Sequence, residues 1–113
     1  MKVAVIGTGL IGASVGLAAR RAGNHVLGWD TNSDALATAA ALGAVEPAES
    51  ADDAAAAADL VVVAVQVTML PTAAEAALAA APDATVTDVG STKGMLAAYR
   101  ERNRPKHEIV EVA

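Results

Sequence analysis

A glycine-rich turn directly after the first apolar run constrains the fold of this chain more than any other feature. The run is Lys2 to Ile6, and a G-x-G-x-x-G pattern follows it at once, made of Gly7, Thr8, Gly9, Leu10, Ile11 and Gly12. A helical stretch from Leu10 to Ala22 comes next and stops at Gly23. In such a strand, turn and helix the glycines permit a tight turn, a close backbone approach to a pyrophosphate, and close packing of the helix on the sheet. We therefore interpret these six residues as a dinucleotide-binding loop, whose free helix-start amides bind the phosphates. The alternative is a turn without a ligand.

Further strands are predicted from continuous apolar and β-branched runs. They lie at His25 to Trp29, Leu60 to Val67, Thr85 to Val89 and Glu108 to Val112. Runs without polar alternation are typical of strands buried on both faces, as in a parallel sheet.

Alanine-rich helical stretches separate these strands. One helix is expected after Asn32 or Ser33 and ends at Gly43, a shorter one follows Ser50, and a third opens at Pro71. Alternating strands and helices imply right-handed crossovers. We predict an α/β fold, a doubly wound parallel sheet of the NAD(P)-binding Rossmann type, forming one three-layer domain over residues 1–113.

The composition limits the classes of partner. A net charge of −5 argues against nucleic acid, because binding a phosphate backbone needs clustered Lys and Arg. The absence of cysteine excludes disulfides, thiolate metal sites and thiol nucleophiles, and agrees with a reducing compartment. No apolar stretch reaches the roughly 18 residues of a membrane helix. We expect a cytoplasmic protein that binds neither nucleic acid nor membranes, and no metal site.

Asp30 is the candidate for recognising the adenosine ribose. It ends the second strand, about 20 residues after the glycines, where an acidic residue accepts hydrogen bonds from both ribose hydroxyls and repels a 2'-phosphate. NADP would call for a nearby Arg, and the following residues are Thr31, Asn32 and Ser33. We expect NAD in preference to NADP. The alternative for Asp30 is a helix-capping carboxylate.

Gln66 and Thr68 follow the strand that begins at Leu60, at the edge where open α/β sheets bind their ligands. Their polar side chains could line the cofactor cleft. A solvated loop is the alternative.

Three segments of the chain resemble the N-terminal nucleotide-binding domain of the prephenate/arogenate dehydrogenase family. They are VIGTGLIGAS at Val5 to Ser14, ADLV at Ala58 to Val61, and DVGSTK at Asp88 to Lys93. The last is the most specific, since the first is shared by many β-hydroxyacid-type dehydrogenases. The resemblance covers essentially the whole chain.

The resemblance implies oxidation of the ring hydroxyl of prephenate or arogenate by hydride transfer to NAD, followed by decarboxylation, in tyrosine biosynthesis. On this basis Ser91 matches the family serine that hydrogen-bonds the reacting hydroxyl and the catalytic histidine. The residues alone favour a simple helix cap at Ser91 or Thr92. Lys93 matches the motif but receives no role. The full-length protein is expected to form a homodimer through a helical C-terminal domain, which this chain lacks.

The chain departs from the family pattern at two points. Gln66 stands where the family usually has a proline, and the catalytic His-Pro motif expected after Val112 is missing. His25 and His107, each at the start of a strand, are predicted to be surface residues and not substitutes. The chain alone should therefore bind NAD with little or no turnover. Two alternatives stay open: another β-hydroxyacid-type NAD(P) reductase, or a non-catalytic NAD-sensing Rossmann module.

Overall fold

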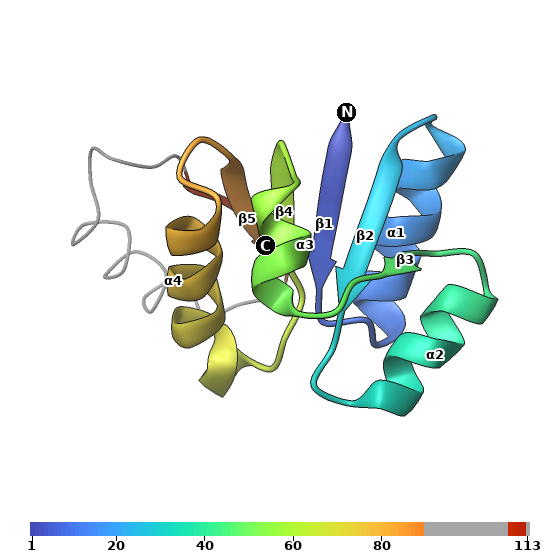
Figure 1. Ribbon diagram of the computed structural model, residues 1–113. Helices are drawn as coiled ribbons and strands as arrows, with labels where there is room; N and C mark the ends of the chain where they lie inside the picture. Colours follow the sequence, from blue (N-terminus) through green and yellow to red (C-terminus); the bar gives the residue numbers. More distant parts are fainter. Residues whose placement is uncertain (90–108, 113) are drawn as a thin grey trace.

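The computed structural model describes residues 1–89 and 109–112, and these form a three-layer α/β fold (Figure 1). All strand pairings are parallel, and the six-stranded sheet has the order β3-β2-β1-β4-β5-β6. The strands are β1 (Lys2–Ile6), β2 (His25–Trp29), β3 (Glu46–Pro47), β4 (Leu60–Val63), β5 (Thr85–Val89) and β6 (Ile109–Val112). The helices are α1 (Leu10–Arg21), α2 (Ser33–Ala41), α3 (Ala51–Ala56) and α4 (Leu70–Ala80), with a 3-10 turn η1 (Val67–Met69) before α4. The predicted doubly wound parallel sheet is confirmed.

The central strand β1 is buried on both faces, which explains its continuous apolar sequence. Val3 and Val5 pack toward α1 and α2, whereas Ala4 and Ile6 pack toward α3 and α4. Successive side chains of a strand point to opposite faces. A strand with helices on both faces therefore needs an apolar residue at every position.

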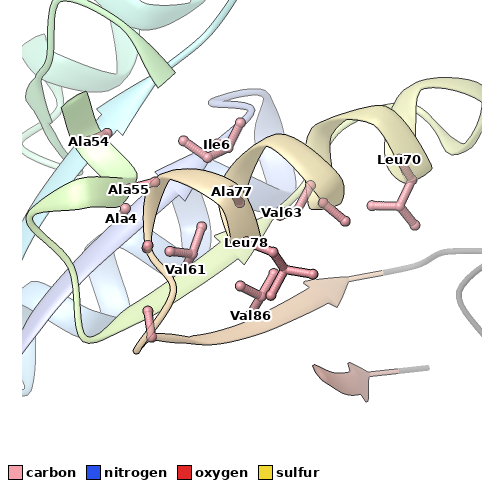
Figure 2. Packing of buried hydrophobic residues seen from close by; sticks show 13 residues of the cluster. Ala4, Ile6, Ala54, Ala55, Val61, Val63, Leu70, Ala77, Leu78 and Val86 are labelled. Carbon is pink, nitrogen blue, oxygen red and sulfur yellow. The ribbon is translucent and has the colours of Figure 1, made fainter. Parts of the chain in front are cut away.

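One face of the sheet is covered by α3 and α4, two alanine-rich helices that lie close to the strands. Leu78 of α4 lies over Val86 of β5 in Figure 2, with Val61 and Ala77 beside them. Alanine presents only a methyl group, so the backbone of α4 can lie near the strands while Leu78 supplies the bulk. Helix propensity and close packing are thus satisfied by the same residue type.

Side-chain caps and glycines set the helix boundaries as the sequence predicts. Asn32 caps α2 by accepting hydrogen bonds from two amides of its first turn, and Ser50 caps α3 through the Asp53 amide. Gly23 after α1 and Gly43 after α2 both have positive φ angles, of 91° and 77°. Such backbone conformations favour glycine, so each helix ends there.

Two elements differ from the sequence prediction. The strand expected over Leu60 to Val67 ends at Val63, because its partner β1 ends at Ile6, the residue paired with Val63. Beyond that point β1 offers no further residue for pairing, and the chain passes through residues 64–66 into η1. The short edge strand β3 is not predicted from the sequence, because it consists of Glu46 and Pro47 and has no apolar pattern.

Candidate dinucleotide-binding site

A cleft of about 450 Å³ opens at the carboxyl ends of β1 and β4. From β1 the sheet extends through β2 and β3 on one side and through β4 on the other, so the chain reverses its direction of travel here. Ligands of open α/β sheets bind in the crevice at such a point. The lining comes from the glycine turn, the end of β2 and the segment after β4, including Gly7, Gly9, Asp30 and Gln66.

Gly7 and Gly12 are glycines because the protein itself leaves no room for a side chain. Gly7 has a φ of 96°, and a Cβ there would lie 2.6 Å from the carbonyl oxygen of Ala64. A Cβ on Gly12 would overlap the carbonyl oxygen of Gly7. The two positions make the tight turn and the close helix packing that the motif predicts.

Gly9 has no such internal reason to be glycine. Its φ is −69°, an ordinary value, and a Cβ built there would meet no heavy atom within 4 Å. The residue is exposed and lines the cleft. It also precedes α1 without a side-chain cap, unlike the residues before α2 and α3. The first amides of a helix lack intrahelical partners and carry partial positive charge, so this end of α1 suits an anion.

The Asp30 carboxylate binds the glycine turn and the residue before α2, and it does not cap the first-turn amides of α2. Its Oδ2 accepts hydrogen bonds from the Thr8 amide at 2.7 Å and from the Thr8 hydroxyl at 3.1 Å. Its Oδ1 accepts from the Asn32 amide at 2.8 Å. The side chain that caps α2 belongs to Asn32. Asp30 therefore stays at the cleft wall, half-buried, as an anionic group within reach of a bound ligand.

The structure separates the remaining residues of the predicted loop. Thr8 is buried, whereas Leu10 and Ile11 on the first turn of α1 are 87% and 58% exposed. Neither of the two lines the cleft, and a large apolar side chain with this exposure is available to a ligand or to another part of a protein. Gln66 lies in the segment between β4 and η1 and lines the cleft, while Thr68 is exposed within η1.

A second, smaller hollow of about 170 Å³ adjoins the cleft. Trp29, Met69 and Val65 contribute to both, and α4 adds Thr72 and Ala76 to the smaller one. Its wall is almost entirely apolar. The sequence analysis missed these residues, because an alanine on a helix and a methionine in a turn carry no local signal that they meet the end of β2.

Ser91 is the predicted catalytic residue, and Lys93, His25 and His107 are assigned no catalytic role in the sequence analysis. Ser91, Lys93 and His107 lie outside the described residues. His25, predicted to be a surface residue, lies at the start of β2, and its exposed ring pairs with Glu46 at 2.7 Å. This is the amino edge of the sheet, opposite the cleft.

Charge and length of the elements bear on two further classes of site. Within residues 1–89 and 109–112, no three His, Cys, Asp or Glu side chains gather where they could hold a metal ion. Over the same residues, every helix is too short or too polar to cross a bilayer.

Solved structures of dehydrogenases share this fold. Prephenate dehydrogenase from A. aeolicus, in complex with hydroxyphenyl propionate and NAD+, is 26% identical with a TM-score of 0.84, over 98% of this chain and 40% of that one. Synechocystis arogenate dehydrogenase is 27% identical with a TM-score of 0.73, over 80% and 33% of the two chains. Mycobacterium tuberculosis 3-hydroxyisobutyrate dehydrogenase is 26% identical with a TM-score of 0.78, over 97% and 39%. The chain thus spans about 40% of the length of the A. aeolicus enzyme.

The sequence itself matches one family profile. No curated protein sequence matches the chain significantly. The profile described as prephenate dehydrogenase, nucleotide-binding domain, matches residues 15–113. This range excludes the glycine turn, so the match does not depend on the G-x-G-x-x-G pattern. The chain belongs to the prephenate dehydrogenase nucleotide-binding domain family and is an NAD(P)-binding Rossmann domain.

Proposed function

We propose that this chain is the NAD-binding domain of a prephenate or arogenate dehydrogenase. The family profile and the likeness to the A. aeolicus and Synechocystis enzymes support this assignment. The single observation that carries the binding function is the geometry of Gly9. Because no protein atom requires a glycine there, the missing side chain is best explained by a ligand that approaches the backbone.

The cleft and the adjoining hollow suggest how a dinucleotide would lie. The pyrophosphate would bind at Gly9 and the first amides of α1, and the adenosine ribose would meet Asp30. The apolar hollow beside Trp29 and Ala76 would take the adenine ring, whose flat faces suit an apolar slot. The expected contact of Gln66 with the cofactor belongs to the same proposal, and Thr68 would contribute only from the rim of η1.

The carboxylate of Asp30 supports NAD as the preferred dinucleotide. A 2'-phosphate would bring negative charge against this anion. Thr31, Asn32 and Ser33 follow it, and none of them offers a positive charge to compensate. We therefore place NADP second.

In the complete enzyme, bound NAD would accept a hydride from the substrate. By resemblance, Ser91 would hydrogen-bond the hydroxyl that reacts and orient the catalytic histidine. That histidine, the helical companion domain and the dimer contact belong to the complete protein in this proposal. Residues 1–113 supply the nucleotide-binding part and, expressed alone, bind the cofactor with little or no turnover.

Calorimetric titration of the chain with NAD tests the binding function. We expect NAD to bind the wild type and to bind a Gly9→Ala variant at least about tenfold more weakly, because the added methyl group occupies the path of the phosphates. The variant should unfold at nearly the wild-type temperature, since its Cβ meets no protein atom. A folded wild-type chain that binds neither NAD nor NADP would contradict the proposal.

Asp30→Ala tests the preference for NAD. The variant should lose most of the discrimination against NADP, and Asp34→Ala serves as the matched control because Asp34 is an exposed carboxylate in the first turn of α2. An unchanged ratio of the two dissociation constants in Asp30→Ala would show that the carboxylate does not cause the preference for NAD.

The runner-up is a β-hydroxyacid-type reductase, which the likeness to 3-hydroxyisobutyrate dehydrogenase favours. Its phosphate loop would look the same. A protein that carries this domain together with its companion domain decides between them: reduction of NAD that depends on prephenate or arogenate supports the first reading, and reduction that depends on 3-hydroxyisobutyrate supports the second.

A further inference from the structure

Thr8 is a buried polar residue that donates two hydrogen bonds to one carboxylate. The residue is 3% exposed, and it lies in the variable position between the first two glycines of the turn. Both its amide and its hydroxyl donate to Oδ2 of Asp30, at 2.7 and 3.1 Å. The Thr8 amide is therefore engaged within the protein and is not among those that would meet a phosphate.

The other oxygen of the same carboxylate is also held. Oδ1 accepts a hydrogen bond from the Asn32 amide at 2.8 Å. An ionised carboxylate has about four acceptor positions, and donors of this chain use three of them. The carboxylate cannot turn about its own axis without breaking at least one of these bonds, and about one acceptor position stays available to a ligand.

We infer that Thr8 is the positioning residue of Asp30 and, through it, sets the discrimination between NAD and NADP. The inference rests on the proposed function, in which Asp30 meets the adenosine ribose. A fixed anion beside the ribose accepts one hydroxyl in a defined direction and excludes a 2'-phosphate. An anion free to swing away would tolerate the phosphate and would hold the hydroxyl less well.

The backbone of the turn is arranged so that Thr8 can act in this way. The Gly7 amide donates to the carbonyl oxygen of Trp29 at 2.9 Å, which joins the turn to the end of β2 one residue before Asp30. Thr8 and Asp30 are thus neighbours through the backbone as well as through their side chains. The hydroxyl of Thr8 is the only one of the three donors that a substitution can remove without altering the backbone.

Thr8→Val is the decisive variant, because valine has the shape of threonine and lacks the hydroxyl, while the backbone amide can still donate to Asp30. We measure the dissociation constants of NAD and NADP by calorimetry and compare their ratio. We expect the dissociation constant of NADP divided by that of NAD to fall about tenfold in Thr8→Val. The same ratio should stay within about twofold of wild type in Thr8→Ser, which keeps a hydroxyl. An unchanged or increased ratio in a folded Thr8→Val protein overturns the inference.

A double-mutant cycle separates positioning from a general structural effect. If Thr8 acts through Asp30, then Thr8→Val changes the ratio in the wild type and leaves it unchanged in Asp30→Ala. An equal change in both backgrounds overturns the inference, because the carboxylate would then be uninvolved. Thr8→Ala, which cannot overfill the site, replaces Thr8→Val in the cycle should the valine variant fail to fold.

The wild-type titration distinguishes a failure of the proposed function from a failure of the role inferred for Thr8. A folded wild type that binds neither dinucleotide overturns the proposed function and this inference together. A wild type that prefers NAD, with the same preference in Thr8→Val, overturns only the role of Thr8.

Discussion

The two edges of the sheet differ in how completely the chain pairs its own polar groups. At the amino edge, donors and acceptors of the chain satisfy one another: the amino terminus donates to Asn24 at 3.0 Å, the Lys2 amide to Asp59 at 2.9 Å, and His25 pairs with Glu46 at 2.7 Å. At the carboxyl edge, Thr8 and Asn32 donate to Asp30, but α1 begins without a side-chain cap, and Gly9 faces open space.

The difference indicates which edge is built for stability and which for a ligand. Polar groups that bind one another stabilise the fold and leave little for a partner. A helix end without a cap and a glycine without a neighbour add nothing to stability, yet both suit an incoming phosphate. The same division holds for barrels and open sheets generally, in which the carboxyl ends of the strands carry the chemistry.

The largest expected effect is that of Gly12→Ala at the carboxyl edge, where tight packing and ligand geometry meet. The new methyl group would overlap the Gly7 carbonyl oxygen, so the turn and α1 must separate. We expect a loss of about 3 kcal/mol in the free energy of unfolding, measured with denaturant. Gly9→Ala, in which the added methyl group meets no protein atom, should lower the free energy of unfolding by less than about 1 kcal/mol. Equal stabilities of the two variants would contradict the distinction drawn between these glycines.

Ala76→Leu should weaken binding of NAD by about tenfold, because the larger side chain fills the apolar hollow proposed for adenine. Ala76 is exposed, so the fold should tolerate the change. Ala79→Leu is the matched control, as it adds the same bulk to an exposed position of α4 that does not line the hollow. Titration calorimetry measures both. Equal affinities of the two variants would place the adenine elsewhere.

Asp59→Ala should lower the free energy of unfolding by about 1 kcal/mol, since the Lys2 amide loses its acceptor. The affinity for NAD should not change, because Asp59 lies at the amino edge. Asp83→Ala removes the same charge from an exposed turn before β5 and should have a smaller effect on stability. A weaker affinity for NAD in Asp59→Ala would show that the two edges are coupled.

Glu46→Gln should have the smallest effect, at most about 0.5 kcal/mol, because its pair with His25 is solvent-exposed on both sides. At a pH where the imidazole is protonated, the effect should shrink further in high salt. Glu49→Gln removes a charge from an exposed neighbour of the same segment and gives the baseline. Denaturant unfolding at two salt concentrations measures both variants, and a salt-independent loss of more than 1 kcal/mol would mean that the pair is part of a larger network.

Local sequence signals predict most of the fold. The runs predicted for β1, β2 and β5 match the strands residue for residue, and in β1 burial on both faces explains the unbroken apolar pattern. Helix boundaries follow because Asn32 and Ser50 are caps and Gly23 and Gly43 are stops, all of which act within a few residues. The predicted end of β4 is wrong by several residues, because the end depends on where β1 ends and not on the local sequence.

The candidate site is predicted only in part. The glycines and Asp30 form a motif whose spacing carries meaning, so the phosphate and ribose positions could be named in advance. The contact of Thr8 with Asp30 could not, because the variable position of the motif has no fixed role. The apolar hollow joins Trp29, Met69 and Ala76 from three separate elements, and no pattern in the sequence brings them together.

Trp29 gives the site an optical property. It is the only tryptophan in the chain, it is half-buried, and it lines both the cleft and the hollow. Its fluorescence therefore comes from one place in the molecule, and a ligand that displaces water from the indole ring should change the intensity or the wavelength of the emission. The chain carries its own label at the position where binding is proposed, and the wild type and every variant above can be titrated by the same signal without attaching a dye.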